Sequence, residues 1–302
     1  MTGQFLRSFG TVVGTALAFG STVALAQEQG HPVPGQIGLQ PAVTPIMDSV
    51  HAFHDGILLW TISLITLLVL VLLVVVMVRF NAKANPKPST NTHNTLIEIA
   101  WTVLPILILV VIAIPSFSVL TDQLTMPDGE RKYLGSNIFS FGDVEVPAPE
   151  LTVKATGEQW YWNYEYVDLG LTFDSNMLKD SELATIKTSQ PRLLAVTNEL
   201  VVPVDTTVRV QVTASPNGVI HAFAVPSFGI KIDAVPGKLN ETWFNARKTG
   251  IYYGQCSELC GQDHAFMPVA VRVVTKEQYA LWIKTLGEGF VEDANATLPE
   301  IE

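Results

Sequence analysis

Two long apolar runs dominate the N-terminal part of the chain. The first, Ile57–Val78, carries no charge and consists mainly of Leu, Val and Ile, and the second extends from Leu96 to about Leu120. A bilayer core requires about 20 such residues in a helix. Pro105 and Pro115 lie inside the second run, where a membrane helix tolerates proline more readily than a soluble helix does. The pattern predicts a transmembrane helix hairpin over residues 57–120.

The charges around this hairpin indicate its orientation. Positive residues of membrane proteins concentrate in the cytoplasmic connections. The connector carries positive and no acidic residues, whereas the outer flanks carry acids; these residues are Arg79, Lys83 and Lys87 inside, and Asp48, Asp55, Asp122 and Asp128 outside. We therefore expect both termini on the periplasmic side of a bacterial cytoplasmic (inner) membrane, with everything after about Thr121 in the periplasm.

An export signal precedes the hairpin. A positively charged start is followed by the apolar, small-residue stretch Thr11–Val23 and by Ala24-Leu25-Ala26, which fits the small-x-small cleavage rule. These features predict a signal peptide over residues 1–26 and a mature chain that starts at Gln27. A short first transmembrane helix is the alternative, but the run is short and rich in glycine. Residues 27–56 are expected to form an extended lead-in rich in Gly and Pro.

Beyond Glu150 the pattern of hydrophobic and polar residues changes. Short alternating segments rich in Val, Thr and aromatic residues are separated by breaks such as Ser215-Pro216-Asn217-Gly218. Many short strands with turn signals predict a β-sandwich or barrel. The expected strands are Leu151–Ala155, Gln159–Glu165, Arg192–Val196, Thr207–Thr213, Ile220–Val225, Glu241–Phe244, Gly250–Tyr253 and Val269–Val274.

The last part of the chain reads as a helix and a tail. Lys276–Leu286 is a candidate closing helix, so the periplasmic domain is expected over residues 121–288. Residues 289–302 are polar and acidic, and we expect them to be disordered or trimmed. The fold class predicted for the whole chain is an α+β membrane protein, with the two-helix hairpin followed by the β-sandwich.

Composition agrees with a membrane protein that does not bind nucleic acid. Of 302 residues, 48% are hydrophobic and only 15% are charged, and the net charge is −10. This acidic balance leaves no basic stripe to neutralise phosphates. It suits a soluble face that attracts a basic partner.

One short stretch concentrates the candidate chemistry. Tyr253–Pro268, reading YGQCSELCGQDHAFMP, contains both cysteines of the chain together with a histidine and a methionine, and His221 precedes it in V-I-H-A-F. Thiolates, imidazoles and a thioether favour copper, zinc or iron–sulfur chemistry over magnesium or calcium. The cluster is Cys256, Cys260, His264, Met267 and His221.

Three kinds of site could use these residues. A disulfide would use Cys256 and Cys260 but would leave the other candidates without a role. A tetrahedral zinc site could take two cysteines and two histidines, but it would not need Met267. Two thiolates can instead bridge two metal ions and leave one histidine for each, so copper is the favoured metal.

Longer motifs add a family resemblance. The run Y-Y-G-Q-C-S-E-L-C-G-Q-D-H-A-F-M-P, the upstream V-I-H-A-F-A-V-P-S-F-G-I-K-I-D-A-V-P-G and G-E-Q-W-Y-W-N-Y-E-Y from Gly157 to Tyr166 resemble cytochrome c oxidase subunit II. The resemblance covers nearly the whole mature chain. It implies a cupredoxin-like sandwich that carries CuA, a centre of two copper ions.

The resemblance also implies a role for each metal ligand. Cys256 and Cys260 would bridge the coppers, and His221 and His264 would each bind one. Met267 and the main-chain carbonyl of Glu258 would complete the two coordination spheres. The Glu258 side chain would contribute to a magnesium site shared with subunit I; the alternative is a solvated loop carboxylate.

Residues outside the loop acquire expected roles in the same way. Trp160 would mark where electrons enter from docked cytochrome c, although ordinary strand packing is the alternative for this aromatic run. Thr197 and Gly218 stand where the comparison with mitochondrial relatives leads us to expect acidic residues, so we expect the acidity of the docking surface to come from other residues. Expected neighbours and acids of that surface are Gln159, Tyr161, Asp174, Glu158 and Asp205.

Glu98 is the remaining unusual residue. It lies at the cytoplasmic start of the second apolar run, where a carboxylate is a functional candidate by default. The resemblance would place it at the mouth of a proton pathway into subunit I, and an interfacial carboxylate is the alternative.

The expected function is therefore electron transfer inside an oxidase. Reduced cytochrome c would give electrons to the copper centre, which would pass them to haem in subunit I for reduction of oxygen to water coupled to proton pumping. Expected partners are subunit I, other oxidase subunits, cytochrome c and membrane lipid. The alternatives are a quinol oxidase subunit, which would lack the Cys and His ligands, a membrane-anchored copper-delivery protein, and a structural domain with one disulfide.

Overall fold

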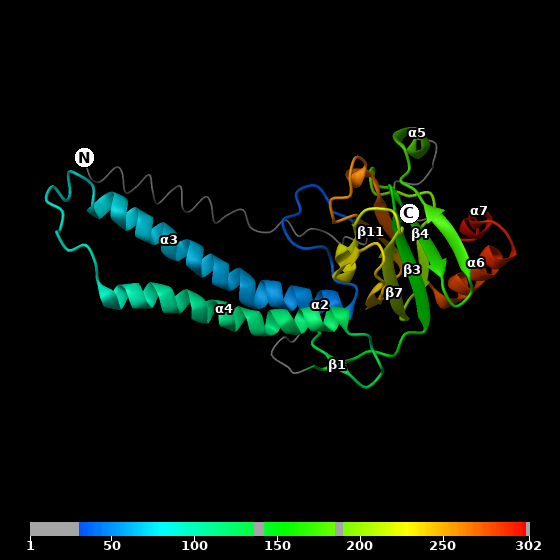
Figure 1. Ribbon diagram of the computed structural model, residues 1–302, viewed down its shortest axis with the longest axis horizontal. Coiled ribbons are helices and arrows are strands. Elements are labelled where there is room, and N and C mark those ends of the chain that lie inside the picture. The colour runs from blue at the N-terminus through cyan, green and yellow to red at the C-terminus, as the bar shows by residue number, and fades with distance from the viewer. Residues whose placement is uncertain (1–29, 136–141, 185–189, 300–302) are drawn as a thin grey trace.

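The computed structural model describes residues 30–135, 142–184 and 190–299. The predicted signal peptide and the predicted start at Gln27 lie outside these residues. The molecule is elongated, with a helix hairpin projecting from a β-domain that contains most of the C-terminal half (Figure 1).

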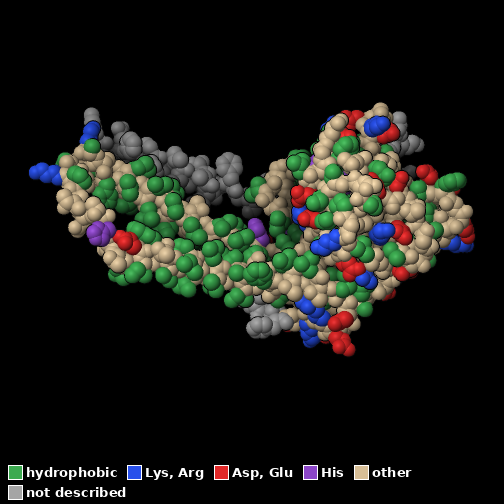
Figure 2. Space-filling model, viewed as in Figure 1, with side chains coloured by type: hydrophobic (Ala, Val, Ile, Leu, Met, Phe, Trp, Pro, Cys, Tyr) green, Lys and Arg blue, Asp and Glu red, His purple; other side chains and the backbone are tan. Residues whose placement is uncertain are grey.

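The hairpin consists of two long helices. The first is continuous from Pro45 to Arg79 and comprises α2 (Pro45–His51), the π-helical segment η1 (Ala52–Leu58) and α3 (Leu59–Arg79). The second is α4 (Thr95–Leu124). Both are long and apolar enough to cross a membrane. Their hydrophobic side chains are exposed along the whole hairpin (Figure 2), which is how lipid-facing helices look in the absence of lipid.

The expectation of an extended lead-in up to residue 56 is wrong beyond Thr44. The side chain of Thr44 accepts a hydrogen bond of 3.1 Å from the amide of Met47 and thereby caps the first helical turn. Pro45 occupies the first helical turn, where its missing amide hydrogen costs nothing. The helix therefore begins about a dozen residues before the apolar run that predicted it.

The domain is built around a five-stranded sheet. Its order is β10-β7-β3-β4-β5, and the burial of β3 alternates along the strand, as in a sheet with one face in the core. The strands are β3 (Leu151–Glu158), β4 (Tyr161–Tyr166), β5 (Leu171–Ser175), β7 (Thr207–Ala214) and β10 (Asn240–Asn245).

A second, smaller layer closes the sandwich. A three-stranded sheet has the order β11-β12-β6, and β8 pairs with β9. Residues of both layers share one hydrophobic core, so the predicted hairpin followed by a β-sandwich is confirmed. The strands are β6 (Leu200–Pro203), β8 (His221–Val225), β9 (Ile230–Ala234), β11 (Gly250–Gln255) and β12 (Pro268–Val274), and a small separate ribbon contains β1 (Lys132–Tyr133) and β2 (Val144–Glu145).

The prediction of a strand over Arg192–Val196 is wrong. Residues 192–194 form a turn, and Val196 makes only an isolated bridge to Met177. The amides of Leu194 and Ala195 both donate to the carbonyl of Pro191, so the local backbone bonds are made within the turn.

The expectation of a disordered tail is also wrong for residues 289–299. Helix α6 (Lys276–Glu288) is followed by α7 (Val291–Asn295). The Asn295 side chain accepts from Trp282 Nε1 at 3.1 Å and donates to the Asn198 side chain at 2.9 Å. Ala294 is fully buried. These contacts hold the acidic segment against the domain.

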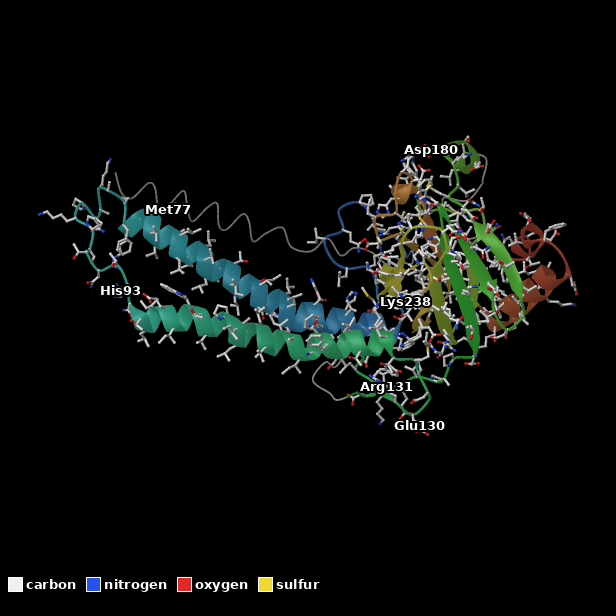
Figure 3. The ribbon with its side chains drawn as sticks, viewed as in Figure 1. Met77, His93, Glu130, Arg131, Asp180 and Lys238 are labelled. Atoms are coloured by element: carbon white, nitrogen blue, oxygen red, sulfur yellow. The ribbon has the colours of Figure 1, made fainter. Side chains whose placement is uncertain are left out.

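Buried polar contacts join α4 to the domain. The Asp122 carboxylate accepts from Arg131 at 3.0 Å and from the amide of Leu134 at 2.9 Å. The main-chain carbonyl of Asp122 accepts from Trp243 Nε1 in β10 at 2.9 Å. In Figure 3, Arg131 lies at the base of the domain, whereas Met77 and His93 lie at the opposite end of the hairpin.

Candidate metal centre

The predicted ligand loop is a connection between two paired strands. Cys256 directly follows β11 and Met267 directly precedes β12. Gln255 and Pro268 are register partners, and the amide of Cys256 donates to the carbonyl of Met267 at 3.2 Å. The ladder therefore fixes both ends of the loop.

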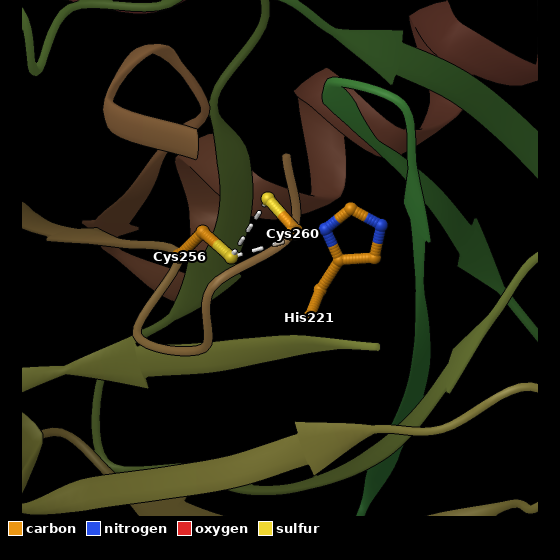
Figure 4. A group of neighbouring side chains, drawn as sticks. All are labelled: His221, Cys256 and Cys260. Atoms are coloured by element: carbon orange, nitrogen blue, oxygen red, sulfur yellow. Dashed lines mark hydrogen bonds between the residues drawn. The ribbon is translucent and has the colours of Figure 1, made fainter. Parts of the chain in front are cut away.

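The structure brings the candidate donor atoms together. The two thiol sulfurs lie 3.8 Å apart. The Nδ1 atom of His221 lies 3.8 Å from Cys256 Sγ and 3.2 Å from Met267 Sδ. The Nδ1 atom of His264 lies 3.5 Å from Cys260 Sγ, which is also 3.6 Å from Met267 Sδ. Figure 4 shows the imidazole of His221 beside the two thiols.

The loop backbone contributes one more donor. The main-chain oxygen of Glu258 lies 3.3 Å from Cys256 Sγ, whereas the Glu258 side chain is exposed. The carbonyl therefore faces the sulfur cluster and the carboxylate faces away from the core. This placement leaves the carboxylate accessible to another molecule.

Burial gives the site its electrostatic character. His221, Cys256, Cys260 and Met267 are all buried. Burial, and secondarily the neighbouring Cys256, raises the pKa of the Cys260 thiol to about 12. Burial, followed by the proximity of His264, lowers the pKa of His221. The metal-free site therefore favours a neutral thiol and a neutral imidazole, and a cation that binds there must displace the thiol proton.

The geometry discriminates among the predicted kinds of site. Both cysteines are free, and their 3.8 Å separation is far from the ~2.05 Å of a disulfide. A site for zinc alone would have no use for Met267, yet its sulfur is packed between His221 and Cys260. The cluster fits a metal site, and its nitrogen–sulfur donor set is of the kind that copper prefers.

Trp160 lies directly beside this cluster. Its indole Nε1 donates to the main-chain oxygen of Cys260 at 3.0 Å. The ring lies against Gly261, where an added Cβ would be 3.0 Å from Trp160 Cζ2. Trp160 is half-buried and its neighbour Gln159 is exposed, so part of the indole reaches the surface above the metal loop.

The expected acidic surface is present only in part. Burial, then Asp174 and Glu158, raise the pKa of Tyr161, so both carboxylates lie near the residue that follows Trp160. Asp205 is different. It lies two residues before β7, and the far end of that strand pairs with Gly157 beside the site. The strand alone spans about 23 Å at ~3.3 Å per residue. The expectation that Asp205 belongs to this surface is wrong.

Glu98 does not approach the metal cluster. It lies in the first turn of α4, which begins two residues after His93, and His93 lies at the end of the hairpin away from the domain (Figure 3). Its carboxylate accepts a hydrogen bond of 3.1 Å from the amide of Asn94. The structure therefore separates the two groups of predicted functional residues by the length of the hairpin.

Sequence reasoning missed two glycines that contact the site. Gly261 lies under Trp160, and Gly157 lies against the His221 ring. The only sequence signal was their position inside motifs chosen for other residues, G-E-Q-W-Y-W and C-G-Q-D-H.

Comparison with known proteins covers both parts of the chain. Residues 151–274 match the family described as cytochrome c oxidase subunit II, periplasmic domain, and residues 32–119 match the corresponding transmembrane domain. A probable cytochrome c oxidase subunit 2 of Rickettsia bellii is 45% identical over 97% of this chain and 98% of its own length. The cytochrome c oxidase subunit 2 of Cereibacter sphaeroides is 40% identical over 94% of this chain and 92% of its own length. The crystal structure of the periplasmic domain of subunit II from Bradyrhizobium japonicum has 58% sequence identity over 47% of this chain and 97% of that chain, with a TM-score of 0.43.

Proposed function

The chain belongs to the cytochrome c oxidase subunit II family, and on that premise we propose that it accepts electrons from cytochrome c at a binuclear copper centre and delivers them to haem in subunit I. It is a subunit of a haem–copper oxidase complex and a membrane protein with two spans. In the proposal, oxygen is reduced to water in subunit I, and this reduction is coupled to proton pumping.

The observation that carries the proposal is the convergence of soft donors in one buried cluster. Cys256 and Cys260 lie 3.8 Å apart, which suits two sulfurs that share two metal ions. His221 lies beside Cys256, and His264 lies beside Cys260. Met267 and the main-chain oxygen of Glu258 would supply the remaining donors.

The surroundings of the cluster suit electron transfer. When bound, the copper pair supplies a reversible one-electron redox change. The protein holds the donors on a loop whose two ends are paired strands, so the ligand geometry is constrained on both sides. Burial of the two thiols excludes water from the site. Both features keep the structural rearrangement on electron transfer small.

The surface above the loop suits a basic electron donor. Trp160 offers a half-buried aromatic face, a residue type enriched at binding hot spots. Glu158 and Asp174 add negative charge beside it. Such charges accelerate encounter with an oppositely charged protein. Cytochrome c would dock here, and its electrons would enter through Trp160.

The exposed Glu258 side chain fits a magnesium site shared with subunit I. Its own main-chain carbonyl faces Cys256, so magnesium bound to this carboxylate would lie next to the copper ligands. Carboxylate oxygen is a preferred magnesium ligand. The remaining ligands would come from subunit I.

The hairpin provides the membrane placement. In the proposal, both termini are on the periplasmic side of the bacterial cytoplasmic membrane, so Glu98 would lie at the cytoplasmic end and mark the mouth of a proton pathway. The contacts of Asp122 with Arg131, Leu134 and Trp243 would hold the copper domain at a fixed position over the membrane.

A copper-delivery role is less well supported. Delivery requires ligands that exchange metal with a partner, whereas both thiols and His221 are buried here. A quinol oxidase role is disfavoured because the complete Cys and His set is present.

The proposal is tested by following electron transfer in the assembled oxidase. Reduced cytochrome c is mixed rapidly with oxidase that contains either the natural chain or Cys256→Ser, and absorbance of the copper centre and of haem is recorded. The proposal expects copper to be reduced before haem, and expects Cys256→Ser to lose both steps. Haem reduction at an unchanged rate in Cys256→Ser would contradict it.

A further inference from the structure

We propose that Gly157 is a positioning residue of the metal centre. Because Gly157 has no side chain, the His221 imidazole has the space to point its Nδ1 atom toward the sulfur cluster. This inference rests on the proposed function for the identity of the metal. The packing of Gly157 against His221 involves only residues of this chain.

The contact between Gly157 and His221 leaves no space for a methyl group. A Cβ at Gly157 would lie 2.8 Å from His221 Cδ2, 2.9 Å from Cγ and 3.1 Å from Cβ. Two of these atoms belong to the imidazole ring. Separations below about 3 Å lie well inside the optimal carbon–carbon contact of ~3.5–4.0 Å, so the ring and the methyl group could not both keep their places.

The backbone does not otherwise require glycine here. Gly157 has no positive φ. It lies inside β3, with Trp162 of β4 and Ala214 of β7 as register partners. A glycine inside a strand weakens it and often marks a close approach. The close approach is that of His221.

The side chains on the inner face of β3 become smaller toward the metal site. Its inward-facing positions are Leu151, Val153, Ala155 and Gly157, and all four are buried. Side-chain size falls at each step in this direction. The space released at the narrow end is filled by the His221 ring, which is itself fully buried.

The His221 ring cannot retreat from a new methyl group without changing the site. Trp162 packs edge-on against it with ring centroids 6.1 Å apart, and Trp162 is in turn packed against Phe223. The Nδ1 atom already lies 3.2 Å from Met267 Sδ. Displacement of the ring therefore changes the position of Nδ1 relative to the sulfurs.

The first experiment is a double-mutant cycle in the metal-free full chain, purified in detergent. Gly157→Ala is made in the natural background and in His221→Ala, and thermal unfolding is recorded. We expect Gly157→Ala to lower the unfolding midpoint by roughly 3–10 °C in the natural background, as overpacking does. In His221→Ala, where the ring is gone, we expect little or no further loss.

An equal loss in both backgrounds would overturn the inference, because the methyl group would then clash with something other than His221. If Gly157→Ala alone fails to fold, recovery of a folded chain in the double variant supports the inference, and failure of the double variant to fold, with His221→Ala itself folded, overturns it. This arm involves no metal, so its outcome is independent of the copper proposal.

The second experiment uses the copper-loaded full chain. Gly157→Ala is compared with Ala155→Gly, which alters the same face of the same strand one inward position away. We expect Gly157→Ala alone to change the copper hyperfine pattern and the nitrogen coupling of one imidazole, and to shift the midpoint potential. Spectra and a potential identical to those of the natural chain would overturn the inference, while copper loading of the natural chain tests the proposed function separately.

Discussion

The indole Nε1 of Trp160 donates a hydrogen bond of 3.0 Å to the main-chain oxygen of Cys260. A partly exposed aromatic residue is thus joined directly to a residue of the metal loop. The indole also lies against Gly261, so a side chain at that position would displace it. Under the proposed function, this bond directly connects the docking surface to a copper-binding residue.

Two substitutions separate the roles of Trp160. Trp160→Phe keeps an aromatic face but removes the donor, so we expect slower electron transfer with nearly unchanged cytochrome c binding. Trp160→Ala also removes the face, and loss of a hot-spot aromatic costs about 2 kcal/mol or more, which is ~30-fold in affinity. Binding and rapid-mixing measurements on the assembled oxidase distinguish the two effects. Unchanged transfer in Trp160→Phe would contradict the proposed route.

The acidic residues beside Trp160 should control the rate of docking. Glu158→Gln and Asp174→Asn are expected to slow association with cytochrome c and to weaken its dependence on ionic strength, because surface charges act within about a Debye length. Asp205→Asn is the matched control, since Asp205 lies at the opposite end of β7. A comparable effect of all three substitutions would mean that only net charge matters.

The buried carboxylate of Asp122 should stabilise the junction between hairpin and domain. Asp122→Ala removes the acceptor of the partly exposed Arg131 guanidinium and of the buried Leu134 amide, and we expect a loss of about 1–3 kcal/mol in the free energy of unfolding. Lys132→Ala is the control, because its pair with Glu145 is exposed and such pairs contribute about 0–1 kcal/mol. The free energy of unfolding of both variants is measured by denaturation in detergent. Equal losses would contradict the prediction, because the contacts of Asp122 would then stabilise the protein no more than an exposed ion pair does.

The C-terminal segment should contribute to stability through Asn295. Asn295→Ala removes the acceptor of the fully buried Trp282 and the donor to Asn198, so we expect a loss of about 1–3 kcal/mol. Glu292→Gln changes an exposed residue of the same helix and should have little effect. A tail that is disordered or removed in the mature protein would make both substitutions silent, and mass spectrometry of the mature chain checks that outcome directly.

Strong periodic or compositional signals were read correctly from the sequence. The two apolar runs became α3 and α4, and the loop of Cys256–Met267 holds every expected donor except His221, which reaches the cluster from β8. These features depend on local sequence, since a bilayer span needs only length and apolarity, and a loop between paired strands brings its own ends together.

Features that depend on long-range packing could not be read in this way. The strand β6 is a short, fully buried run, and a run of that kind carries no alternation to mark it. Residues 289–299 are ordered by Trp282 and Arg272, which the acidity of the segment does not reveal. The role of Gly157 depends on a ring that lies 64 residues further along the chain, so spacing alone gave no indication of it.

The central claim is tested most directly by copper analysis of the full chain. The chain is purified in detergent, its thiols are reduced, copper is added, and metal content and the electron paramagnetic resonance spectrum are recorded, with Cys260→Ser as control. The proposal predicts two coppers per chain and hyperfine structure from one unpaired electron shared over both nuclei, which the control should lose. One copper with a single-nucleus pattern, or no copper and a Cys256–Cys260 disulfide, would contradict the binuclear centre.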